Sequence, residues 1–179
     1  MIHVEATGYF CTAVMGSRPW SYTILAVELG MSSSQIHSAV KRALAAKLAV
    51  RQREKIVPNF RNLEEFLVHG LKYVFWAEQG EMTRGMPTAY AAPPLAGLLV
   101  STVAEPPPVW PDPDGEVRGI AFRPLHKLAS QAAQADKNLY ELLTLVDAVR
   151  GGRARVRKIA TKKLSMRLEQ YASDNKPQP

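Results

Sequence analysis

The sequence has almost no cysteine, because Cys11 is the single residue of that type among 179. One thiol cannot form an internal disulfide, so a disulfide-stapled secreted fold is excluded and the reducing cytoplasm is the expected compartment. Cys11 lies in an apolar stretch, and free cysteines are usually buried. We therefore expect Cys11 to be a core residue rather than a redox sensor.

Long hydrophobic runs are also missing. No apolar segment approaches the roughly 20 residues that a membrane-spanning helix needs. The first ten residues, MIHVEATGYF, do not combine a basic segment with a following apolar stretch, so we expect no signal peptide. We accordingly expect no membrane partner.

The sequence lacks the common catalytic and metal-binding motifs. It contains no HExxH, no phosphate-binding glycine loop and no G-x-S-x-G, and one cysteine cannot make a thiolate zinc site. Asp112 and Asp114 flank Pro113, a spacing more typical of a turn than of a pair of catalytic carboxylates. None of the histidines has a partner at metal-ligand spacing: His3, His37, His69 and His126. We expect no enzyme activity, no cofactor and no metal.

Residues 20–48 carry the clearest local signals that are present. Ser21 is placed to cap a first helix, and Gly30 stands where a left-handed residue ends a helix at low cost. Ser32 and Gln35 have the spacing of a capping box at the start of a second helix. Two helices joined by so tight a turn predict a helix-turn-helix, a shape that fits the major groove of DNA.

The second of these helices has two distinct faces. Ile36, Val40, Ala43 and Leu44 recur at helical spacing and should face inward. The polar and basic residues that we expect to contact DNA are Ser33, Ser34, His37, Ser38 and Lys41, with Arg42 flanking them. Periodicity alone allows a solvated helix in an all-α bundle equally well, and the tight turn favours DNA binding.

The segment that follows predicts a β-hairpin. Apolar residues 48–50 and 56–58 would form its strands, and its tip would carry Arg51, Arg53 and Lys55 toward a phosphate backbone. With this hairpin the first 60 or so residues resemble the winged helix-turn-helix regulators of the MarR-like kind. The resemblance implies a further helix packed across the pair, for which residues 4–15 are the candidate segment.

The basic residues are concentrated at the carboxyl end. Residues 1–60 carry a net charge of +4, residues 61–149 carry −4, and residues 150–179 carry +7. The last stretch has helical spacing of apolar residues, and we count its first basic side chains as candidate DNA contacts: Arg153, Arg155, Arg157 and Lys158. Docking on an acidic partner protein and a simply solvated helical face remain alternatives.

The middle of the chain is harder to assign. We expect helices at 62–76, 95–103, 125–135 and 138–150, and one candidate short strand at 117–123. Residues 78–94 are rich in Gly, Pro and Ala and are expected to form a long loop. The segment EPPPVWPDPD at 105–114 is too rich in proline for a helix or the interior of a sheet. It would lie extended over the body, anchored by Trp110, or dock a partner.

The sequence therefore predicts a mainly α protein. A winged helix-turn-helix at 1–60 would precede a helical dimerisation or partner region at 61–172 and a disordered tail at 173–179. The chain is loosely similar to the AbiE-type antitoxins, which repress their own operon. The similarity rests on the winged helix together with the segments HGLKYVF, RGMPTAYAAPPL, PPPVWPDPDG and LYELLTLVDAVRGGRARVR. The resemblance implies a homodimeric, sequence-specific autorepressor that binds double-stranded DNA. An antitoxin that neutralises a toxin protein through residues 61–179, and a sequence-tolerant nucleic-acid-binding protein, are the alternatives.

Overall fold

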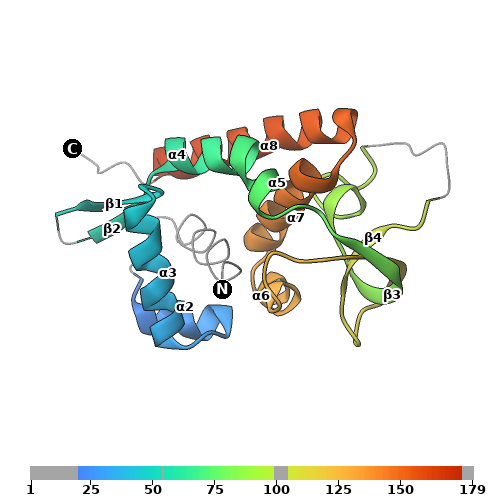
Figure 1. Ribbon diagram of the computed structural model, residues 1–179, viewed down its shortest axis with the longest axis horizontal. Coiled ribbons are helices and arrows are strands. Elements are labelled where there is room, and N and C mark those ends of the chain that lie inside the picture. The colour runs from blue at the N-terminus through green and yellow to red at the C-terminus, as the bar shows by residue number, and fades with distance from the viewer. Residues whose placement is uncertain (1–19, 54, 99–104, 175–179) are drawn as a thin grey trace.

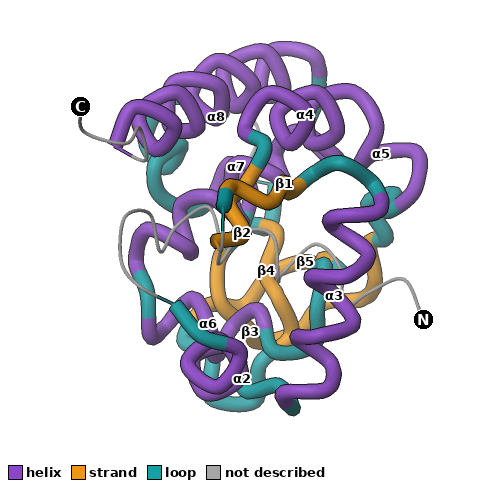
Figure 2. Tube along the Cα trace, turned by 90° about the vertical axis from the view of Figure 1, so that its left-hand side faces the viewer, coloured by secondary structure: helices purple, strands orange, loops and turns teal. Residues whose placement is uncertain are grey.

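The computed structural model describes residues 20–53, 55–98 and 105–174. Helices α2 and α3 and the hairpin β1–β2 occupy one end of the molecule, and strands β3, β4 and β5 occupy the other (Figure 1). Helix α7 lies between the two ends, and α8 runs along one side of the molecule beside α4 (Figures 1 and 2).

The predicted helix-turn-helix is present. Helix α2 spans Tyr22–Leu29 and α3 spans Ser33–Ala45. The Ser21 hydroxyl accepts a hydrogen bond from the Ile24 amide at 3.2 Å, and Gly30 adopts the left-handed conformation with φ of +62°. Ser32 and Gln35 form the predicted capping box, in which each side chain accepts a hydrogen bond from the other residue's amide. Side-chain caps thus start both helices, and the left-handed backbone of Gly30 ends the first one at the turn.

The hairpin is also present. Strands β1 (Ala49–Gln52) and β2 (Lys55–Pro58) are antiparallel, with Gln52 opposite Lys55. Arg53, in the turn between them, has φ of +55°. The helix expected at residues 4–15 lies outside the described residues.

The helix expected at 62–76 is divided into three parts. Helix α4 (Phe60–Glu65) is capped by Asn59, a π-helical turn η1 follows at Phe66–Gly70, and α5 covers Leu71–Val74. Asn62, the expected cap, instead donates a hydrogen bond to the carbonyl of Lys47. A Cβ on Gly70 would lie 3.0 Å from the Phe66 ring, so the absence of a side chain there makes room for that ring inside the wider turn.

The prediction of a mainly α protein with one short strand in its second half is wrong. Helices account for 55% and strands for 18% of the structure, which makes the fold mixed. Strand β3 (Gln79–Pro87) forms in the expected loop at 78–94, and β4 (Pro108–Pro111) forms in the proline-rich segment. Strand β5 (Val117–Phe122) occupies the expected strand position.

Glycines and prolines are the physical reason for this error. Each of the three strands pairs with the other two, and β3 is antiparallel to both. Their backbones approach so closely that a Cβ on Gly85 would lie 1.9 Å from the Trp110 carbonyl oxygen, and a Cβ on Gly119 would lie 2.0 Å from that of Pro107. The glycines that suggest a loop are what this crossing requires. Pro108 and Pro111 stand at the two ends of the short β4, where a missing N–H is tolerated.

The remaining helices build the core. Helix α6 spans Ala129–Ala135, α7 spans Lys137–Gly151 and α8 spans Ala154–Asp174. Residues Leu142 to Arg150 of α7 are all buried, because α6, α8, η2 (Ala89–Ala91) and the α4–α5 segment pack around this helix. At 95–98 the chain forms turns rather than the expected helix, and residues 99–104 are not described.

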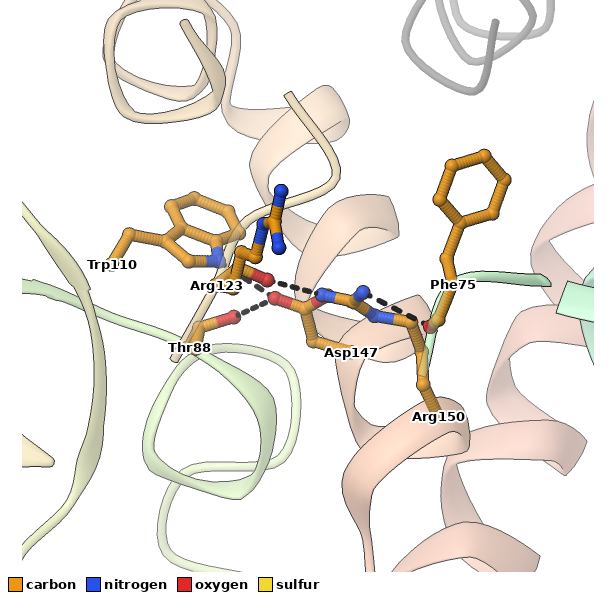
Figure 3. A network of polar contacts seen from close by, with 6 residues as sticks. All are labelled: Phe75, Thr88, Trp110, Arg123, Asp147 and Arg150. Atoms are coloured by element: carbon orange, nitrogen blue, oxygen red, sulfur yellow. Dashed lines mark hydrogen bonds and ion pairs between the residues drawn. The ribbon is translucent and has the colours of Figure 1, made fainter. Parts of the chain in front are cut away.

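A buried polar network ties the strand-rich end to α7 (Figure 3). The Asp147 carboxylate accepts hydrogen bonds from the Thr88 hydroxyl at 2.8 Å and the Trp110 indole N–H at 2.6 Å. Arg150 forms an ion pair with Asp147 at 2.8 Å and donates to the backbone carbonyls of Phe75 and Arg123. Both charged side chains are almost fully buried, and each has several hydrogen-bonding or ionic partners. They stabilise the fold only when both are present, because removing one would leave the other charge buried without its partner.

Candidate nucleic-acid interface

The outer face of α3 presents the predicted polar stripe. Ser34, His37, Ser38 and Lys41 are exposed, and Ser33 is exposed at the first turn. Ile36, Ala39, Val40 and Ala43 are buried on the opposite face. Hydroxyl, imidazole and ammonium groups are thereby displayed on one slim helical surface, which is the chemistry that contacts phosphates and base edges in the major groove.

Two aromatic side chains that the sequence analysis did not single out support this stripe. The Tyr22 ring stacks on the His37 imidazole with a centroid distance of 4.3 Å and an interplanar angle of 15°. Trp20 packs edge-on against Tyr22 at 5.6 Å. The stack restricts the orientations open to His37, so the first helix helps to hold a side chain of the second. Tyr22 stands at the start of α2, at the end away from the turn, and no spacing in the sequence indicated its contact with His37.

The hairpin displays basic side chains near its tip. Arg51 and Arg53 are exposed, as is Lys55 on the returning strand. Glu54, the acidic residue of this turn, lies outside the described residues. The hairpin projects from the end of the molecule that carries α3 (Figures 1 and 2), so one duplex could meet both elements.

Arg42 is placed differently from the other candidates on α3. It is half-buried rather than exposed, and its side chain lines a cavity together with residues of α4, η1 and α5. Its guanidinium therefore lies at the junction between α3 and the body of the protein, beside the polar stripe instead of within it.

Two of the candidate residues on and before α8 have partners inside the protein. Arg153 forms an exposed ion pair with Glu105 at 2.8 Å. Arg157 donates hydrogen bonds to the carbonyls of Val149 at 3.1 Å and Gly152 at 3.0 Å, so it satisfies backbone acceptors at the end of α7. This position explains Arg157 as a helix-capping side chain.

Two further basic residues of the stretch 150–179 also have partners inside the protein. Arg150 belongs to the buried network, and Arg167 forms an ion pair with Glu141. Arg155, Lys158 and Lys162 are exposed on α8 and share one face by their spacing. Helix α8 begins at the end away from the hairpin (Figure 1), so Arg155 and Lys158 in its first two turns lie apart from the surface of α3 and the hairpin.

No three His, Cys, Asp or Glu side chains lie close enough together to hold a metal ion in the ranges 20–53, 55–98 and 105–174. In the same ranges no helix combines the length and apolar character that crossing a bilayer requires. His37 and His69 are exposed, whereas His126 is buried and accepts a hydrogen bond from the Leu128 amide.

Comparisons with protein-family models, with curated proteins and with solved structures found no match to this chain. Its function must therefore be inferred from the chemistry and placement of its own residues.

Proposed function

We propose that this protein is a sequence-specific DNA-binding transcriptional regulator that acts as a homodimer and represses its own gene in the cytoplasm. The observation that carries the proposal is the exposed stripe of Ser34, His37, Ser38 and Lys41 on a helix that starts at a capping box, directly after a turn closed by the left-handed Gly30. The adjacent hairpin supplies Arg51, Arg53 and Lys55 for the phosphate backbone.

Binding to the DNA upstream of its own gene tests the proposal directly. Fluorescence anisotropy with that fragment should give saturable binding that weakens steeply as salt rises, because phosphate contacts release counterions. Footprinting should give two symmetric half-sites about one helical turn apart if a homodimer binds. Equal affinity for unrelated DNA of the same length would instead support a sequence-tolerant nucleic-acid-binding protein.

A matched pair of double variants separates the two basic surfaces. Arg51→Ala with Arg53→Ala removes two positive charges from the hairpin, and Arg155→Ala with Lys158→Ala removes two from α8. Each lost phosphate contact lowers the salt slope by about 0.9, so losing two contacts in each protomer should lower the slope of the homodimer by about 3.6, while the α8 variant keeps the parent slope. A reduced slope only in the α8 variant would contradict the proposed placement of the DNA.

Lys41 distinguishes base contacts from backbone contacts. If its ammonium contacts a base edge, Lys41→Ala should weaken binding to the upstream fragment by about 1–3 kcal/mol more than binding to unrelated DNA. Equal losses on the two DNAs would make Lys41 a phosphate contact.

A second function, partner binding by residues 61–179 as in an antitoxin, is favoured by one observation. Tyr73 and Trp76, three positions apart in the chain, are 76% and 63% exposed, although large aromatic side chains are normally covered. Co-expression with the protein of the neighbouring gene tests this idea. A stable complex that is lost in Tyr73→Ser with Trp76→Ser, but kept in the Arg51/Arg53 variant, would support partner binding separate from DNA binding.

A further inference from the structure

A cavity of about 780 Å³ opens between the carboxyl end of α3 and the α4–η1–α5 segment. Cavities of roughly 300–1,000 Å³ are typical of small-molecule sites. Its wall comes from two stretches of the chain: Arg42 and Ala45 of α3 with Ala46 and Leu48 directly after it, and residues between Asn62 and Phe75.

Most of the lining is apolar. Phe66 and Phe75 contribute rings, Val74 and Leu48 add aliphatic surface, and Ala45, Ala46 and Gly70 leave space. The π-helical turn matters here, because π turns are rare and often accompany functional sites. A Cβ on Gly70 would press on the Phe66 ring at 3.0 Å, so the present position of this ring depends on that glycine.

The polar side chains of the lining have a mixed character. Asn62, Glu65 and His69 recur at the spacing of one helical face along α4 and η1, and Arg42 adds a guanidinium from α3. Arg42 can only donate hydrogen bonds, and an ionised Glu65 can only accept them. The complementary molecule therefore both accepts and donates, and its flat apolar faces would lie against the Phe66 and Phe75 rings.

We propose that this cavity is a binding site for a planar heteroaromatic molecule of about the size of a nucleoside. Ring nitrogens and carbonyl oxygens of such a molecule can accept from Arg42, and its amino or imino N–H groups can donate to Glu65. A simple aromatic acid can accept from Arg42 but has no N–H to donate to Glu65, so it forms fewer hydrogen bonds in this site than a nucleobase does.

The site joins the DNA-facing helix to the core. Arg42 and Ala45 belong to α3, while the backbone carbonyl of Phe75 accepts a hydrogen bond from Arg150 of the buried network. Any effect of the bound molecule on DNA affinity rests on the proposed function. Binding is therefore measured without DNA, so that a failure of the site and a failure of the DNA proposal are separable.

Isothermal titration of the full chain with guanosine, adenosine, cytidine and benzoate tests the proposal. At least one nucleoside should bind with one-to-one stoichiometry and more tightly than benzoate. Absence of binding by all three nucleosides, or tighter binding of benzoate, would overturn it.

Two variants and one control locate the binding. Ala46→Trp fills the cavity from an exposed position and should weaken nucleoside binding by at least about tenfold, whereas Ala135→Trp places the same ring on the exposed end of α6 and should not. Glu65→Gln, also at an exposed position, removes a negative charge and should weaken nucleoside binding without weakening the binding of the benzoate anion. Thermal melting confirms that each variant is folded. Equal losses in Ala46→Trp and Ala135→Trp, or no loss in Glu65→Gln, would overturn the assignment.

Discussion

Residues 20–58 and residues 59–174 differ in how far along the chain their structural partners lie. In the first region Ser21 bonds Ile24, Ser32 bonds Gln35, and the hairpin strands are joined by a two-residue turn. In the second region Gly85 pairs with Pro111, and Thr88 bonds Asp147, which is 59 positions away. The helix-turn-helix and hairpin region is thus specified locally, while the body depends on contacts that form only when the whole region is assembled.

The largest effect that follows from this difference should come from Asp147. Asp147→Ala leaves the Arg150 guanidinium buried without its anion and should lower the free energy of unfolding by about 3–5 kcal/mol in urea denaturation. Glu105→Ala removes the partner of the exposed Arg153 and serves as the control, with an expected loss of at most about 1 kcal/mol.

Hydrogen exchange would sharpen the Asp147 result. If the body alone is loosened, amides of β3, β4 and β5 in the milder Asp147→Asn variant should exchange faster while those of α3 change little. A uniform increase through α3 and the strands would mean that the two regions unfold as one unit, and the comparison between them would not hold.

The next prediction compares the loss of stability when a glycine of each region is replaced by alanine. Gly30→Ala places a side chain in a left-handed conformation, which costs about 1–2 kcal/mol. Gly85→Ala would bring a Cβ to 1.9 Å from a backbone oxygen, so the strands must separate and the loss of stability should be larger. Denaturation midpoints of the two variants test the order. A smaller loss for Gly85→Ala would show that the strand crossing can adjust.

The same contrast explains which features could be predicted from the sequence. Capping residues, the left-handed Gly30 and the polar stripe of α3 depend on near neighbours and on helical period, so they were predictable. Strands β3 and β4 were not, since a glycine or proline marks a loop unless the backbone that packs against it is known. The same limit applies to the site: neither the stack of Tyr22 on His37 nor the capping of α7 by Arg157 follows from spacing alone.

The smallest expected effect concerns Tyr140, which lies on α7 next to the strand-rich end. Its hydroxyl donates to the Pro87 carbonyl at 2.8 Å, its ring meets Trp110 edge-on, and burial raises its pKa to about 12. In the unfolded chain a tyrosine ionises near pH 10. The folded state therefore holds this proton more tightly, so its contribution to stability is complete below pH 10 and is lost as the pH rises toward 12.

Tyr140→Phe should remove that pH dependence. At neutral pH the variant should be less stable by about 1 kcal/mol, because the hydrogen bond to Pro87 is lost. Between pH 10 and 12 the unfolding free energies of the parent and the variant should converge. Only the parent has a phenol that must stay protonated in the folded state, so only its unfolding free energy falls in this range. If the two curves of unfolding free energy against pH stay parallel over this range, the contact between α7 and β3 does not hold the phenol. Residues 20–58 and 59–174 would then differ less in their long-range contacts than the structure indicates.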